Sequence, residues 1–203
     1  MTYLSPAKIN LFLHIISKRD DGYHNLQTIF QLLDFYDEIN FSLRDDGKIN
    51  RTSGNEDIPL ADDLMIKSAN KLQKFSRTNF GVDIRIIKNI PTGGGLGGGS
   101  SNAATTLIAL NDLWGLELTK KQLMMIGKDI GADVPVFIEG QSAWAEGIGE
   151  ILHPMNLTKY FYLVVSINKQ ISTQEIFSHK ALTMTPVQRK MSDFSLVSNP
   201  HND

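Results

Sequence analysis

The chain has 203 residues, a formal net charge of −2 and no cysteine. This length predicts one large domain or two small ones with a substantial core. The near-neutral charge gives no basic field for nucleic acid, and the lack of cysteine excludes disulfides, thiolate metal sites and cysteine nucleophiles. The five histidines lack metal-ligand spacing, so no structural metal is expected. Without a basic leader or an apolar run of about 20 residues, the sequence predicts a cytoplasmic protein with no membrane span.

The first third of the chain is expected to form antiparallel β-structure. Apolar and polar residues alternate over residues 5–16, which predicts a strand with one face in the core. Lys8 and Asn10 fall on the face opposite the core residues. Residues 39–43 alternate again, before a turn signal at Asp46-Gly47. The core face of the first strand is predicted to carry Ala7, Ile9, Leu11, Leu13 and Ile15.

The rest of the chain mixes helices with strands. A helix is predicted over residues 62–76, with Asp62 or Asp63 as its N-cap. Thr119 and Gln122 form a capping box at the start of another helix. The remaining expected elements are strands over 82–86, 142–152 and 160–167, a helix from about Ser101, and continuation of the capped helix to Ile130. The fold class is therefore α+β, in two layers.

A glycine-rich loop separates the predicted strand at 82–86 from the helix that follows it. Residues 93–101 hold six glycines and a single leucine, followed by Asn102. Missing β-carbons let several backbone N–H groups converge on one ligand, and a helix N-terminus adds its dipole. The pattern predicts an anion site, with a flexible linker disfavoured because the loop lies between two regular elements.

Three familiar phosphate-binding motifs do not fit this loop. A Walker loop needs lysine after the last glycine, whereas Ser100 follows Gly99. Gly93, Gly95 and Gly98 match the dinucleotide fingerprint, but helices follow where a second strand ending in an acidic residue is required. The HRD and DFG motifs of protein kinases are absent.

The loop, together with three other segments, resembles the GHMP kinases, the family of galactokinase, homoserine kinase and mevalonate kinase. The resemblance covers about residues 4–177. It implies a GHMP kinase N-terminal domain over 1–155, with a ribosomal protein S5 domain 2-like mixed sheet packed against helices. It also implies that 156–203 begin a ferredoxin-like C-terminal domain. The matching segments are Ser5–Leu13, Asp21–His24 with Gln31, Pro91–Asn102 and Gly131–Phe137.

The resemblance implies an ATP-dependent kinase of the non-mevalonate isoprenoid route. It would transfer the γ-phosphate, with Mg²⁺, to the 2-hydroxyl of a methylerythritol that carries a cytidine diphosphate group. Lys8 and Asp133 are the implied catalytic residues, with Asp133 as general base or hydroxyl-orienting carboxylate. A lysine beside a carboxylate keeps it ionised. The alternatives are a solvated strand lysine and an aspartate that serves only as a helix cap.

The implied binding residues fall into two sets. For the substrate, Tyr23 stacks on the cytosine, His24 bonds to its edge and Phe177 closes the other face, unless Phe177 is a plain core residue. Gln174 stands where relatives often carry proline. The substrate set is completed by Asn10 and Thr173. The ATP set is Pro91, Gly93, Gly94, Gly95, Leu96, Gly97, Gly98, Gly99, Ser100, Ser101 and Asn102, with Asp63, Leu64, Met65 and Lys88 around the adenine. Mg²⁺ is expected on the ATP phosphates, near Ser100 or Ser101, without a carboxylate cage.

Family members continue beyond the length of this chain with a third glycine motif. The resemblance therefore predicts weak or no activity for the 203 residues alone. Two other functions stay open: a nucleotide-binding module without catalysis, and a GHMP kinase for another alcohol such as homoserine. Neither a nucleic-acid nor a membrane partner is expected, and the oligomeric state is not predicted.

Overall fold

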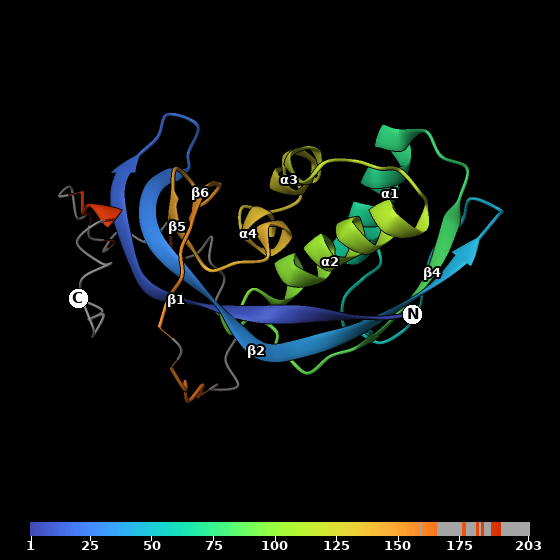
Figure 1. Cartoon of the computed structure of the whole chain (residues 1–203), viewed down its shortest axis with the longest axis horizontal. Helices are drawn as coiled ribbons and strands as arrows, with labels where there is room; N and C mark the ends of the chain where they lie inside the picture. Colours follow the sequence, from blue (N-terminus) through green and yellow to red (C-terminus); the bar gives the residue numbers. More distant parts are fainter. Residues whose placement is uncertain (159, 166–175, 178–181, 183, 185–187, 192–203) are drawn as a thin grey trace.

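The computed structural model describes residues 1–158, 160–165, 176–177, 182, 184 and 188–191. The elements in chain order are β1 (Thr2–Lys18), β2 (His24–Arg44), β3 (Ile49–Ser53), α1 (Leu64–Ser76), β4 (Gly81–Ile87), α2 (Gly98–Leu113), α3 (Lys120–Lys128), α4 (Val134–Glu139), β5 (Ala143–Glu146) and β6 (Ile151–Pro154). Strands and helices pack in two layers, with the helices on one face of the sheet (Figure 1). The predicted α+β class is confirmed.

The long strand β2 organises the sheet. It pairs antiparallel with β1 along most of its length. Its residues 38–44 pair with β4, and its residues 28–30 pair with β5. β3 adds in parallel beside β4, and β6 pairs antiparallel with β5. The two ends of β2 therefore support two different groups of strands, while β1 runs along both.

A bulge in β1 overturns part of the predicted face pattern. The register shifts between Asn10 and Leu13, so β1 holds one more residue than β2 over this stretch. The extra residue reverses the alternation. Phe12 is consequently buried and Leu13 is exposed, the opposite of the prediction. Lys8 is also buried, so the alternative of a solvated strand lysine is wrong.

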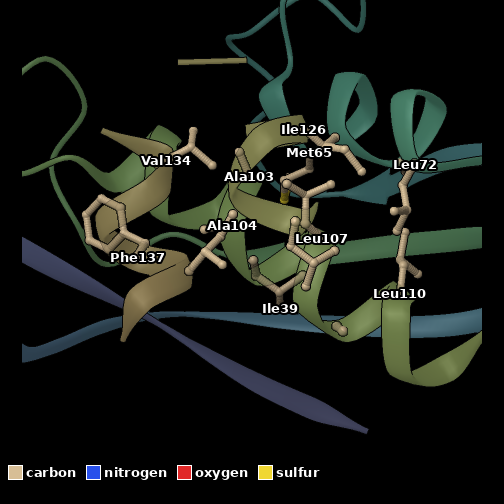
Figure 2. Close-up of a cluster of buried hydrophobic side chains, with 14 of the residues drawn as sticks. Ile39, Met65, Leu72, Ala103, Ala104, Leu107, Leu110, Ile126, Val134 and Phe137 are labelled. Atoms are coloured by element: carbon tan, nitrogen blue, oxygen red, sulfur yellow. The ribbon is translucent and has the colours of Figure 1, made fainter. Parts of the chain in front are cut away.

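Helix α2 is the centre of the core. It is buried on almost every side, because small residues such as Ala103, Ala104 and Thr106 let neighbouring elements approach closely. Figure 2 shows side chains of β2, α1, α3 and α4 gathered around it, among them Ile39 and Met65. The helix that follows the glycine loop is thereby fixed from all directions.

The predicted helices are largely confirmed, with differences at their ends. Asp63 is the N-cap of α1, and the capping box of Thr119 and Gln122 is present at α3. α2 begins at Gly98 rather than near Ser101, because the helical turn is already formed inside the glycine run. α4 was not predicted, since its six residues are too few to show helical periodicity.

Two expected strands differ in the structure. Residues 142–152 were predicted as one strand, but they form β5, a turn and the first half of β6, because glycines at 147 and 149 take positive φ. Residues 160–165, part of the strand predicted over 160–167, form no strand, and Phe161 and Leu163 are exposed. A strand requires a neighbour for its backbone bonds, and these residues pair with none in the described chain.

β3 was not predicted, and two further expectations lie beyond what the structure tests. The domain boundary at residue 155 stays a prediction, because much of 156–203 lies outside the described residues. Among the helices that the structure describes, none has the length and apolar character to cross a membrane.

The N-cap of α1 yields a stability prediction. Asp63 is buried, accepts from the backbone of Met65 at 2.8 Å, and forms an ion pair with Arg51 at 2.7 Å. Asp63→Ala should lower the free energy of unfolding by about 3–5 kcal/mol, because it leaves a buried guanidinium without its partner. Urea denaturation measures the loss. Thr119→Ala is the matched control, since it removes an exposed cap worth about 1 kcal/mol. Equal losses for the two variants would show that the Arg51 pair adds no stability.

Candidate active site

Lys8 and Asp133 meet at the start of α4. Lys8 Nζ lies 3.3 Å from Asp133 Oδ2 and donates to Asn10 Oδ1 at 2.6 Å. The Lys8 side chain is 7% exposed, whereas that of Asp133 is 32% exposed. Asp133 occupies the N-cap position of α4, but its side chain makes no capping bond. The carboxylate is therefore directed to Lys8 and accessible to a ligand, so the alternative of a capping side chain is wrong.

A chain of polar groups orients Asn10. Its Nδ2 donates to Thr28 Oγ1 at 2.7 Å, and the Thr28 hydroxyl donates to the backbone carbonyl of Phe12. Because the amide nitrogen is engaged in this way, the amide oxygen faces the Lys8 ammonium. Asn10, predicted as a substrate-binding residue, thus also holds Lys8.

The glycine loop passes close to this pair. The Lys8 backbone N–H donates to the Leu96 carbonyl at 2.9 Å, and Leu96 packs with Ala7 and Ile90. Gly97 has a φ of 71°, and a β-carbon there would lie 2.8 Å from Phe137 Cζ. Glycine is therefore required at this position for both conformation and space.

Ser100, in the first turn of α2, lies near the turn that carries Asp133. A β-carbon at Gly131 would lie 3.6 Å from Ser100 Oγ. The loop and the N-terminus of α2 therefore meet the lysine–aspartate pair at one place. An anion on the loop amides would lie beside an accessible carboxylate, which is the arrangement that phosphoryl transfer to a hydroxyl requires.

A buried carboxylate fixes the base of the loop. Asp37 is 0% exposed, and its Oδ1 accepts from the backbone of Asn89 at 2.8 Å and of Ile90 at 2.9 Å. Its Oδ2 accepts from Lys88 Nζ and from Asn102 Nδ2. Asp37 on β2 thus joins the segment that enters the loop to the helix that leaves it.

The two serines predicted near Mg²⁺ differ in their exposure to solvent. Ser101 is buried, and its hydroxyl accepts from Ser5 Oγ at 2.8 Å. Asn102 is buried too, with its amide engaged by Ser5, Asp37 and Lys88. Ser100 is partly exposed, so its hydroxyl is the better placed of the two for a ligand.

The four residues predicted around the adenine lie in different environments. Asp63 and Met65 are buried, the first as a cap and the second in the main core. Leu64 is partly buried, and its Cδ1 would lie 3.5 Å from a β-carbon at Gly99. Lys88 Nζ is bound to Asp37 and Asn102 under the loop. Of the four, Leu64 and Lys88 lie beside the glycine loop.

The predicted cytosine residues lie at the β1–β2 hairpin, where the two strands curve toward the helix side of the sheet (Figure 1). The His24 ring stacks on Phe177 with centroids 5.5 Å apart. Tyr23 is 57% exposed. The structure therefore brings two of these residues together, whereas Thr173 lies outside the described residues.

The hairpin turn is held by Arg19 and Asp21. The Arg19 guanidinium donates to the carboxylate and holds the pKa of Asp21 below its usual value. Asp21 also accepts from the Tyr23 backbone at 3.1 Å. A cavity of about 290 Å³ adjoins the hairpin, lined among others by Asn25 and Glu146.

No cluster of three or more His, Asp or Glu suited to a metal occurs among the described residues.

The comparisons with known proteins agree with this geometry. The family description "GHMP kinases N terminal domain" matches residues 63–141. The chain is 61% identical over 202 residues to the 4-diphosphocytidyl-2-C-methyl-D-erythritol kinase of Ruthia magnifica subsp. Calyptogena magnifica, covering 100% of this chain and 71% of the relative. It is 49% identical over 195 residues to that of Cupriavidus metallidurans, covering 96% of this chain and 67% of the relative.

Solved structures give the same result. A crystal structure of 4-(cytidine 5'-diphospho)-2C-methyl-D-erythritol kinase matches with a TM-score of 0.66 and 37% identity, over 78% of this chain and 56% of that chain. The Methanococcus jannaschii mevalonate kinase, at 14% identity and a TM-score of 0.57 over 77% of this chain and 56% of that chain, supports the fold alone. The chain therefore belongs to the GHMP kinases, a family of small-molecule kinases, and within it to the 4-diphosphocytidyl-2-C-methyl-D-erythritol kinases.

Asp37 and Phe30 were not predicted as site residues. Asp37 carries a signal in the sequence, because it precedes Ile39 and Phe41 at the same two-residue spacing and so takes a core position of the strand. A charged residue at a core position indicates a buried partner. Phe30 looks like any other apolar strand residue, and only the fold places Lys8 over it.

Asp37 should be essential to the loop. Asp37→Asn keeps an acceptor for the backbone of Asn89 and Ile90 but faces Lys88 with an N–H donor. We expect it to lower the free energy of unfolding by about 3–5 kcal/mol and to weaken binding of a non-hydrolysable ATP analogue. Denaturation and calorimetric titration measure the two effects. Asp46→Asn, at an exposed pair with Arg44, should change neither. Wild-type affinity in Asp37→Asn would show that the loop does not depend on this carboxylate.

Gly97 and Gly95 form a matched pair for testing the close approach of the loop. Both have positive φ, 71° and 73°, but a β-carbon at Gly95 would meet nothing within 4 Å. Each alanine variant pays about 1–2 kcal/mol for the left-handed backbone. Gly97→Ala additionally collides with Phe137, and should weaken the ATP analogue at least about tenfold more than Gly95→Ala, a difference of about 1.4 kcal/mol. Equal affinities would mean that the ring moves aside without disturbing the loop.

Proposed function

We propose that the chain carries the ATP-binding and catalytic residues of a kinase that phosphorylates the 2-hydroxyl of 4-diphosphocytidyl-2-C-methyl-D-erythritol. The observation that supports this proposal most strongly is the Lys8–Asp133 pair beside Gly97 and the start of α2. The relatives of the chain bear this substrate in their names. A cytoplasmic location belongs to the same proposal.

In the proposed reaction, the loop amides and the N-terminus of α2 bind the ATP phosphates. Ser100 is the hydroxyl that would contact Mg²⁺, which when bound would neutralise charge on those phosphates. Asp133 orients the acceptor hydroxyl and takes its proton as the oxygen attacks the γ-phosphorus, while the bond from that phosphorus to the β–γ bridging oxygen breaks and ADP leaves. Lys8 holds the Asp133 carboxylate by their ion pair and offsets negative charge near the transferred group.

The proposed nucleotide and substrate contacts differ in how directly they act. Leu96, Gly97 and Ser100 line the phosphate region. Four of the predicted residues are buried and would act indirectly. Ser101 and Asn102 would hold the loop in place, and Asp63 and Met65 would hold α1. The direct contacts proposed for the glycines at 93–95 and 98–99 come from backbone N–H groups, which their exposed or partly exposed positions allow. Pro91 has no N–H, so its proposed contact with the nucleotide is made by its exposed ring.

The cytidine end is proposed to bind at the hairpin. A cytosine ring stacking on Tyr23 or Phe177 would gain about 1–3 kcal/mol per aromatic face. The His24 ring now stacks on Phe177. Binding as proposed therefore requires these two rings to separate, so that Phe177 stacks on the base while His24 bonds to its edge. Thr173 belongs to the same proposed pocket.

A second candidate is a nucleotide-binding module without catalysis. The chain spans 71% of the first relative and 56% of the first solved structure, and this second function concerns those residues by themselves. The two functions differ in whether phosphoryl transfer takes place once ATP is bound. Calorimetric titration with ATP, combined with a coupled assay of ADP release, separates them: binding without ADP release at saturating substrate favours the module.

Asp133→Asn tests the enzyme. The amide keeps the shape of the carboxylate but cannot take a proton, so turnover should fall by about two to four orders of magnitude with ATP affinity retained. ADP release with 4-diphosphocytidyl-2-C-methyl-D-erythritol measures it. Asp129→Asn is the control, because this nearby carboxylate is exposed and paired only with Lys71 among the described contacts. Near-normal turnover in Asp133→Asn would remove Asp133 from the mechanism. ADP release by the wild-type chain that is faster with homoserine than with 4-diphosphocytidyl-2-C-methyl-D-erythritol would contradict the proposed substrate.

A further inference from the structure

The Lys8 ammonium lies over an aromatic ring that the proposed mechanism does not use. Its Nζ is 5.2 Å from the centroid of the Phe30 ring. Phe30 is buried, at 2% exposure, and belongs to the main hydrophobic cluster. A buried ammonium loses most of its hydration, so each group around it matters to its stabilisation.

The ring is held from three sides. In the sheet, Phe30 lies between Asn10 of β1 and Ala143 of β5. At the tip of the ring, a β-carbon at Gly149 would lie 3.7 Å from Phe30 Cζ and 3.9 Å from the Ala132 carbonyl. Because Ala132 precedes Asp133, the ring is packed close to the turn that carries the carboxylate. Its position is therefore fixed relative to both partners of the ion pair.

The ring attracts the Lys8 ammonium without occupying one of its N–H donors. A lysine ammonium has three N–H donors. Among the described residues its polar contacts are Asn10 and Asp133. A ring face attracts the cation through its quadrupole without using a hydrogen-bond acceptor. The ammonium can thus be stabilised while one donor stays available to a substrate oxygen.

We infer that Phe30 is a positioning residue, whose ring face holds the Lys8 ammonium in place and directed at Asp133 during phosphoryl transfer. The inference rests on the proposed function for its effect on turnover. The placement of Lys8 over the ring can be read without any turnover, so the two are tested separately.

The first experiment reads the placement by NMR. Protons of the Lys8 side chain near the ammonium should be shifted upfield by the ring current of Phe30, with their signals assigned from Lys8→Met. Phe30→Leu, similar in volume but without a ring, should abolish the shift. Its absence in the wild-type protein would overturn the inference, whatever the turnover.

The second experiment varies the ring electrostatics at nearly constant shape. Mono-, di- and trifluorinated phenylalanine are incorporated at position 30, because fluorine withdraws charge from the ring face. The logarithm of kcat should fall stepwise, to a loss of about tenfold for the trifluorinated ring, while KM for ATP stays unchanged. The same series at Phe41, another buried ring of β2 that packs edge-on against Tyr3, is the control and should leave kcat constant.

The outcomes separate the two hypotheses. A kcat that falls with fluorination at Phe30 but stays constant with fluorination at Phe41 supports the positioning role. A ring that only fills space would not produce this difference. A flat series at Phe30 overturns it, even if Phe30→Leu is too unstable to measure. An intact ring-current shift together with turnover that Asp133→Asn leaves unchanged would refute the proposed function and leave the placement of Lys8 standing.

Discussion

The arrangement of the site depends on the compensation of one buried charge. The Asp37 carboxylate lies on β2 and accepts from the backbone after β4, from Lys88 and from Asn102 of α2. A buried carboxylate without these donors would cost several kcal/mol, about the size of a typical net folding stability. Because the donors come from segments far apart in the sequence, they reach the carboxylate together only when β4 and α2 are in register with β2. The charge therefore selects the geometry that the loop needs.

The glycine loop gains its shape from its attachments. A backbone with six glycines can adopt many conformations, and ordering it costs conformational entropy. One end is fixed through Asp37, and the other through burial of α2. Between them, Leu96 is the single side chain that anchors the loop, packing on Ala7 while its carbonyl accepts from the backbone of Lys8. The same lysine thus ties the loop by its main chain and meets Asp133 by its side chain, which couples the proposed phosphate end of the site to the Lys8–Asp133 pair.

Local features of the fold could be predicted from the sequence, and features set by register or by distant contacts could not. The capping box at Thr119 and the glycine loop act within a few residues, so their patterns identify them. The bulge after Asn10 changes no local propensity, yet it decides that Phe12 is buried rather than Leu13. The contact between Asp37 and Lys88 spans 51 positions of the chain, beyond any periodicity. The roles of the site residues came from resemblance, and they stay proposals.

The β1–β2 ribbon explains how the separate parts of the site keep a constant spacing. Along β2, His24, Phe30 and Asp37 follow one another from the hairpin to the base of the loop. One strand therefore has a residue at the proposed cytidine end, one beside the Lys8–Asp133 pair and one at the proposed phosphate end. A strand rises about 3.3 Å per residue and resists stretching. Its pairing with β1 over most of its length prevents independent movement of these points. Side-chain changes at the hairpin can therefore alter the proposed base contacts without moving the Lys8 ammonium. The β1–β2 pairing between the two places keeps their spacing constant whichever side chains the hairpin carries.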